Sequence, residues 1–142
     1  MGETTTHLIT VARSACGGFL LVEAFSTGSV GVVILTAQGS IYTGICIDLA
    51  CELWLCAKAT AGAEALKHRE THISAVVVVS KDGILPPCGC CREIMVQVNV
   101  RSFDCRVIVG EDHPFALREL LPNHRLIQST QQLLALLRRC TL

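Results

Sequence analysis

The order of the expected elements predicts an α/β fold, a three-layer α/β/α sandwich built on a mixed sheet of roughly five strands. Three observations support this prediction. Hydrophobic residues make up 51% of the 142 residues, which is enough for a substantial core. Runs rich in β-branched residues alternate with helix-forming segments. The run "HISAVVVVS" is continuously apolar, as expected for a strand covered on both faces. A chain of this length is expected to form a single domain over residues 1–142.

The first half of the chain predicts a helix followed by a hairpin. Residues 4–23 place apolar side chains on one side of a helix, with an interruption at Gly17-Gly18. The runs "SVGVVILTA" and "SIYTGICI" are typical of strands. Gln38-Gly39 joins them, and we expect a tight hairpin because glycine tolerates the positive φ of such turns.

The second half predicts alternating helices and strands. Alanine, leucine, lysine and glutamate favour a helix over residues 56–69, and Asp-Gly with two prolines favours a loop at "KDGILPP". In order, the expected elements are the helix 56–69, the strand "HISAVVVVS", the loop, a helix over 88–98, the strand "DCRVIVG", a short helix "PFALRELLP" and a terminal helix "TQQLLALLRRC".

The composition excludes several classes of protein. The 12 basic and 12 acidic residues give a formal net charge of zero, which argues against an extended nucleic-acid surface and favours a small ligand. The longest apolar runs are shorter than the ~18 residues of a membrane span. No basic N-terminal region leads into an apolar stretch with a cleavage site, so we expect a cytoplasmic protein without a membrane partner.

The cysteines carry the strongest functional signal. Nine cysteines without an export signal indicate reduced thiols and a metal. Cys88 and Cys91 form a C-x-x-C pair at an expected helix start, and Cys56 stands at another. Three cysteine ligands leave the fourth position of a tetrahedral Zn²⁺ open, as in catalytic sites. A redox pair at Cys88 and Cys91 is the alternative, and the helix register favours Cys91 over Cys90 as the third ligand.

The segments "LCAKATA", "GILPPCGCCREIMV" and "ALRELLP" resemble the cytidine deaminase family, and most closely its blasticidin S deaminase branch. The resemblance extends from "VGVVILTAQGSIYTG" to "LRELLP" and implies a cytidine deaminase-like fold and a homotetramer. It also implies that Cys56, Cys88 and Cys91 hold Zn²⁺, which activates water to attack C4 of a cytosine-type ring with loss of ammonia. The backbone N–H of Cys88 would hold the developing oxygen charge, and the Pro87 carbonyl would accept from the departing amine.

Lys58 departs from the family pattern at the catalytic position. The family has a glutamate there, which takes a proton from the zinc-activated water and returns it to the substrate. A lysine side chain is normally protonated and cannot accept that proton. Neither Glu52 nor Glu64 is expected to replace the glutamate, so activity should be weak or absent. Many family members have arginine at the next position, where this chain has Ala59, so Lys58 is also a candidate to neutralise thiolate charge.

The substrate-binding positions implied by the resemblance are Cys46, Asp48 and Ala57. Ribose-binding members have G-x-N-x-E where this chain has "GICID", and cysteine is a poor replacement for asparagine. The resemblance therefore predicts a zinc-dependent deaminase of cytidine or a related aminopyrimidine nucleoside, such as blasticidin S. The alternative is a catalytically inactive relative that binds zinc and a nucleoside.

Overall fold

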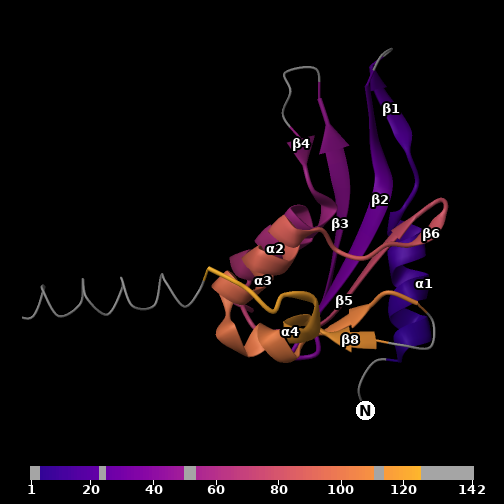
Figure 1. Ribbon diagram of the computed structural model, residues 1–142. Helices are drawn as coiled ribbons and strands as arrows, with labels where there is room; N and C mark the ends of the chain where they lie inside the picture. Colours follow the sequence, from indigo (N-terminus) through magenta and orange to yellow (C-terminus); the bar gives the residue numbers. More distant parts are fainter. Residues whose placement is uncertain (1–3, 23–24, 50–53, 111–113, 126–142) are drawn as a thin grey trace, which may run out of the picture.

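The computed structural model describes residues 4–22, 25–49, 54–110 and 114–125. Within these ranges eight strands form one mixed sheet, and helices cover both of its faces (Figure 1). The strands are β1 (Phe19–Val22), β2 (Phe25–Thr36), β3 (Ile41–Asp48), β4 (Trp54–Leu55), β5 (Ile73–Ser80), β6 (Gly83–Ile84), β7 (Arg106–Ile108) and β8 (Pro114–Ala116). The helices are α1 (Thr5–Ala15), α2 (Ala57–Lys67), α3 (Gly89–Val98), the 3-10 helix η1 (Val100–Asp104) and α4 (Leu117–Leu120).

The strands run in the order β4-β3-β2-β5-β7-β8, with β1 added to β2 and β6 added to β5. The pair β5 and β7 is parallel, whereas β2 is antiparallel to both β3 and β5. The sheet is therefore mixed, as the sequence predicts. The expected strand segments correspond to β2, β3, β5 and β7. The further strands β1, β4, β6 and β8 have two to four residues each, so the described sheet has eight strands where roughly five are expected.

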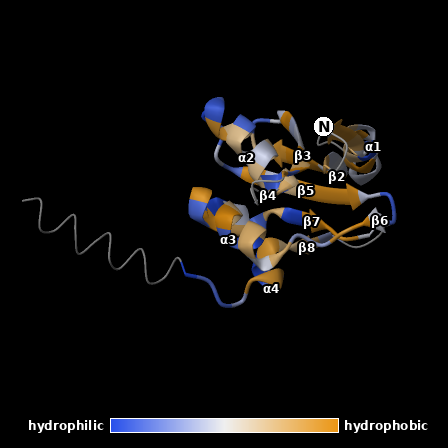
Figure 2. Ribbon diagram, turned by 90° about the horizontal axis from the view of Figure 1, so that it is seen from above, coloured by the Kyte–Doolittle hydropathy of each residue, from blue (hydrophilic) through white to orange (hydrophobic). Residues whose placement is uncertain are grey.

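Alternation along β2 and β5 builds a separate core on each face of the sheet. Val32 and Ile34 face α2 and α3, whereas Val33 and Leu35 face α1. β5 is buried on both faces, which explains its continuous run of valines. In Figure 2, α1 lies on one side of the sheet and α2, α3 and α4 lie on the other, which confirms the three-layer arrangement.

The first helix is shorter than predicted, because α1 ends at Ala15 and residues 19–22 form β1 instead. Thr4 caps the start of α1, where its side chain accepts from the N–H of His7 at 3.2 Å. Gly17 and Gly18 separate the two elements, and the apolar stretch after them pairs with β2. A short apolar run fits a helix or a strand equally well, so periodicity alone misassigned it.

Two further segments differ from the prediction. The "PFALRELLP" segment is divided between β8 and α4, where a helix alone is expected. The expected loop "KDGILPP" contains the two-residue strand β6. The predicted terminal helix "TQQLLALLRRC" lies outside the described residues. In the described part of the chain, no helix is long and apolar enough to cross a membrane.

The helix α2 is held closely at both of its ends. At its start, the Thr60 hydroxyl donates to the Ile45 carbonyl of β3 at 3.0 Å. At its end, Arg69 adopts a left-handed conformation with φ of 64°. The N–H of Arg69 donates to Leu66 O at 2.9 Å and that of Glu70 to Ala65 O at 3.0 Å, the pattern of a Schellman motif.

Candidate functional site

The heads of α2 and α3 bring three cysteines together. Cys56 and Cys88 stand at the N-cap positions of α2 and α3, without a capping hydrogen bond from either side chain, and Cys91 lies in the first turn of α3. The sulfur of Cys91 lies 3.2 Å from that of Cys56 and 3.2 Å from that of Cys88. Cys91 is buried, whereas Cys90 is exposed. The choice of Cys91 over Cys90 as a metal ligand stays a prediction.

The sulfurs contact one another as thiols. Among the described residues, no group of three or more His, Cys, Asp or Glu side chains is arranged as a metal site. Sulfurs bound to one tetrahedral zinc lie about 3.8 Å apart, given Zn–S bonds of about 2.3 Å. The thiols would have to separate by roughly half an ångström to hold zinc. The donor set itself suits zinc, because thiolates at helix N-termini are favoured ligands for this ion.

The thiols of Cys88 and Cys91 differ in their acidity. Burial opposes ionisation of Cys88, but the backbone N–H and side chain of Cys91 and the Lys58 ammonium together hold the pKa of Cys88 below its ordinary value. Burial and the contacts with Cys56 and Cys88 raise the pKa of Cys91, an effect that Lys58 partly opposes. Cys91 therefore holds its proton in this arrangement, and a metal that bound there would displace it.

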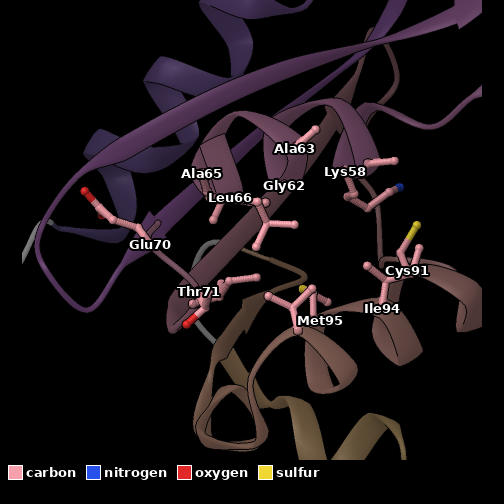
Figure 3. Close-up of a pocket in the computed structure, with 14 residues that line it drawn as sticks. Lys58, Gly62, Ala63, Ala65, Leu66, Glu70, Thr71, Cys91, Ile94 and Met95 are labelled. Carbon is pink, nitrogen blue, oxygen red and sulfur yellow. The ribbon is translucent and has the colours of Figure 1, made fainter. Parts of the chain in front are cut away.

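Lys58 stands beside the cysteines at one end of an apolar pocket. Figure 3 shows Lys58 and Cys91 at that end, with Glu70 and Thr71 at the opposite end. Ala59 also lines the pocket and brings no charge. The ammonium of Lys58 therefore acts electrostatically on Cys88 and Cys91, and its role in offsetting thiolate charge stays a prediction.

Glu64 and Glu70, both within the described residues, do not occupy the place of a proton shuttle beside the cysteines. Glu64 pairs with Lys67 at 2.7 Å on the exposed side of α2, and Glu52 lies outside the described residues. Glu70 lines the far end of the pocket and accepts hydrogen bonds from Ser40 Oγ at 2.8 Å and Tyr42 Oη at 3.1 Å. It also accepts from Thr36 Oγ1, which lowers the pKa of Glu70 most strongly. No pattern in the sequence singles out Glu70, because its partners come from other elements.

Arg92 fixes the loop that carries Pro87 and Cys88. Its Nε donates to the Pro87 carbonyl at 2.8 Å, and its terminal nitrogen donates to the Leu120 carbonyl at 2.7 Å. The carbonyl proposed to accept from a departing amine is thus already engaged by Arg92, although a carbonyl oxygen has a second lone pair. No sequence pattern pointed to this contact, because Leu120 lies on a different element.

The expected substrate-binding residues lie on β3 and at the start of α2. Cys46 is buried, with its sulfur 3.2 Å from Ser29 Oγ. Burial raises the pKa of Cys46, but hydrogen bonds from Ser29 and neighbouring backbone groups outweigh it and lower the pKa overall. Asp48 is exposed at the end of β3, opposite Trp54 of β4. Ala57 is buried as the first residue of α2, directly after Cys56.

Known proteins resemble this chain in both sequence and fold. No model of a protein family matches the sequence. A probable cytidine deaminase of Dictyostelium discoideum is 33% identical over 76 residues, which are 51% of this chain and 52% of that protein. The match therefore spans about half the length of this relative.

The solved structures extend the similarity over most of the chain. A cytidine deaminase of Burkholderia pseudomallei is 26% identical with a TM-score of 0.69, over 86% of this chain and 99% of that one. A mutant cytidine deaminase of Mycobacterium tuberculosis is 23% identical with a TM-score of 0.71, over 86% and 98%. The chain has the cytidine deaminase fold. This result confirms the fold class predicted from the sequence.

Within the cytidine deaminase fold, the predicted site residues divide into two groups. Cys56, Cys88 and Cys91 meet at the heads of two helices with Lys58 beside them. Asp48 lies apart from this group in sequence, on an exposed strand end. The roles of all these residues in binding metal or substrate stay predictions.

Proposed function

We propose that the chain is a zinc-dependent hydrolytic deaminase of cytidine or a related aminopyrimidine nucleoside, such as blasticidin S, with activity reduced by Lys58. The observation that carries this proposal is the contact of three cysteine sulfurs at the N-termini of α2 and α3. The Cys91 sulfur lies 3.2 Å from the sulfur of Cys56 and 3.2 Å from that of Cys88. The similarity to cytidine deaminases in sequence and fold supports the reaction class.

Cys56, Cys88 and Cys91 would hold the metal and leave one position open. Zinc, when bound, acidifies a water molecule and so supplies the nucleophile of hydrolytic deamination. The residues of this chain then have to place the ring and move protons. The N–H of Cys88 at the start of α3 is suited to stabilise developing negative charge on oxygen, because helix N-termini favour anions.

Lys58 is expected to lower the rate of this reaction. A protonated amine can donate to a ring nitrogen but cannot first accept a proton from water. Cys46 and Asp48 are the proposed contacts for the sugar part of the substrate. The Cys46 sulfur already contacts Ser29 Oγ at 3.2 Å, which leaves Asp48 as the exposed polar group of the pair.

Metal analysis tests the first half of the proposal. The full chain, expressed with zinc and purified without chelators, should contain about one zinc per molecule. Cys88→Ser and Cys91→Ser should lose it, whereas Cys90→Ser, an exposed neighbour in the same helix, should retain it. A metal-free protein with a reversible Cys88–Cys91 disulfide would contradict the proposal and support a thiol redox protein.

Restoring the glutamate tests the second half. Ammonia release from cytidine and from blasticidin S should be near background for the natural chain. The Lys58→Glu variant should gain at least ~100-fold, because a positioned acid–base group contributes roughly 10²–10⁴-fold in rate. If zinc is bound but the variant gains nothing, the chain is instead a zinc- and nucleoside-binding relative without catalysis, our second candidate.

We also propose that the chain assembles as a homotetramer through the end of the sheet that carries β1 and β4. Leu55, Ile47, Thr27 and Phe19 follow one another in register across β4, β3, β2 and β1. Large apolar side chains on both outer strands are exposed to solvent: Phe19, Leu20, Leu21, Trp54 and Leu55. Exposed apolar groups gathered in this way favour association. Light scattering should give four times the mass of one chain, and Leu20→Glu with Trp54→Glu should lower it.

A further inference from the structure

A cavity of about 670 Å³ lies where the end of α1, the first half of β2 and the turn between β5 and β6 meet. The residues that line it include Gly17, Gly18, Ser29, Val30 and Leu85. Cavities that bind small molecules commonly have a volume of about 300–1,000 Å³. This cavity is therefore large enough to hold a nucleoside.

Two of the lining residues connect the cavity to the cysteine cluster. Val30 and Leu85 both pack against the core to which Ala57 of α2 contributes, and Ala57 directly follows Cys56. Leu85 lies three residues before Cys88. Because three residues of extended chain span at most about 11 Å, a molecule in the cavity lies close to the predicted zinc site.

The strand β2 has a bulge where it borders the cavity. It lies between β1 and β3 (Figure 1), and three of its residues, between the paired Thr27 and Gly31, stand opposite Cys46 of β3. Gly28 has a φ of 77°, a conformation that favours glycine. Bulges interrupt the alternation of a strand and redirect a side chain, often next to an active site. In β2 the residue that follows Gly28 within the bulge is Ser29.

The bulge brings Ser29 Oγ to 3.2 Å from the Cys46 sulfur and leaves Ser29 in the cavity wall. Ser29 is exposed, whereas Cys46 is buried. A hydroxyl group has one donor and two acceptor positions, and the contact with Cys46 uses one of the three. The Ser29 hydroxyl is therefore the member of this pair that is able to accept a hydrogen bond from a bound molecule.

We propose that Ser29, displayed by the bulge of β2, binds the 2′- or 3′-hydroxyl of the substrate's sugar in place of Cys46. This inference rests on the proposed function and adds a residue that selects nucleosides with a hydroxylated sugar. The sugar hydroxyl donates to Ser29 Oγ, and the contact with the Cys46 sulfur holds the serine side chain in position. With the sugar at Ser29, the ring extends past Val30 and Leu85 toward the cysteine cluster.

Binding of two nucleosides to the zinc-loaded full chain tests the role of Ser29. Isothermal titration calorimetry compares cytidine with 2′,3′-dideoxycytidine, which lacks both sugar hydroxyls in question. Ser29→Ala should weaken cytidine binding by about fivefold, the effect of one neutral hydrogen bond, and should leave dideoxycytidine binding unchanged. Ser26→Ala is the matched control, because Ser26 is also an exposed serine of β2 but does not line the cavity. It should leave the binding of both nucleosides unchanged.

The outcomes separate the role of Ser29 from the proposed function. If Ser29→Ala weakens both nucleosides equally, or weakens neither, the role of Ser29 is overturned and the proposed function stands. If neither nucleoside binds to the natural chain although zinc is present, both are overturned. A loss confined to cytidine and absent from Ser26→Ala supports the proposal.

Discussion

Lys58 sets the electrostatic character of the cysteine cluster. Its ammonium is one of the causes that hold the pKa of Cys88 below its ordinary value, and it partly opposes the burial that raises the pKa of Cys91. A glutamate at this position would instead add a negative charge beside three thiols. A cluster of three thiolates with one divalent cation carries a net negative charge, and a nearby cation reduces that charge. Lys58, which we propose weakens proton transfer, is therefore also suited to stabilise metal binding.

The first prediction concerns the charge on Lys58. Lys58→Ala should weaken zinc affinity by about tenfold, because groups outside the ligand set typically contribute 10–100-fold to metal affinity. Competition with a zinc-binding dye measures this change. Lys67→Ala is the control, since Lys67 lies on the same helix and pairs with Glu64 on the exposed side. Equal affinities for the natural chain and Lys58→Ala would rule out the charge-compensating role.

Arg92 links three parts of the chain through a single side chain. It is a residue of α3 that donates to carbonyls in the loop before the helix and at the end of α4. Arg92→Ala should lower the free energy of unfolding by about 2 kcal/mol or more, because hydrogen bonds from charged groups contribute roughly 1.5–3 kcal/mol each. Urea unfolding checks the value. Arg101→Ala, an exposed arginine in η1, should change it by less than about 0.5 kcal/mol.

At the residue scale, the sequence predicted the cysteines but not their polar neighbours. The C-x-x-C spacing and the helix starts placed Cys56, Cys88 and Cys91 correctly relative to α2 and α3. The partners of Arg92 and Glu70 come from elements far away in sequence, so no local pattern contains them. Such contacts follow from the way the elements pack, which a single sequence does not specify.

At the scale of elements, the start of α2 depends on a glycine in β3. A Cβ on Gly44 would lie 2.5 Å from Thr60 Oγ1 and 2.6 Å from Ala61 N, and closer still to Ala57 O. The missing side chain lets the first turn of α2 rest directly on the strand. Because Cys56 stands at the N-cap position of this helix, the close contact also positions one member of the cysteine cluster.

The substitution Gly44→Ala tests this contact, and Gly62→Ala is its matched control. Gly44→Ala should destabilise the protein by about 1–3 kcal/mol, the usual cost of overpacking, and should weaken zinc binding by shifting Cys56. Gly62→Ala lies within α2, where an added Cβ meets nothing within 4 Å. It should stabilise the helix by up to about 1 kcal/mol. Thermal unfolding measures both, and similar midpoints for the two variants would contradict the packing argument.

The elements themselves were predictable where they are long and regular. The helices α2 and α3 and the buried strand β5 were predicted close to their observed bounds. The strands β1 and β8 were missed, because each has four residues or fewer and its residues also fit a helix. For segments this short, pairing with a neighbouring strand decides the structure, and that pairing is not a local property.

At the scale of the whole molecule, three glutamates make the free energy of unfolding depend on pH. The hydroxyl of Thr36 lowers the pKa of Glu70, Lys67 lowers the pKa of Glu64, and Gln97 lowers the pKa of Glu93. Each native pKa is thus below the value in the unfolded chain, near ~4.3. The stabilisation is fully present above that value and is lost as the pH falls through the native pKa values, because the unfolded chain then binds more protons.

Stability measured at several pH values tests this linkage. The free energy of unfolding in urea should stay level from pH 7 to about 5.5 and fall between about pH 4.5 and 3. Glu70→Gln should make that fall shallower, since it removes one of the linked groups. The exposed Asp82→Asn in the turn after β5 serves as the comparison. A fall that is equally steep in the Glu70→Gln variant would contradict the role of Glu70.

The fold class was predictable because composition, element order and the family resemblance all agreed on it. The cytidine deaminase fold, the mixed sheet and the helices on both of its faces are confirmed. The single-domain organisation and the homotetramer stay predictions. Assembly depends on which exposed surfaces fit one another, and the exposed side chains of β1 and β4 became visible only once the strands were paired.

The turn that ends α2 is a site at which a substitution can stabilise the protein. Arg69 holds a left-handed φ of 64° at the position where Schellman motifs usually have glycine. A glycine there would relieve the backbone without touching any cysteine, with a gain of up to about 1 kcal/mol. Arg69→Gly therefore provides a sturdier background in which damaging substitutions at the cysteines can be purified and compared.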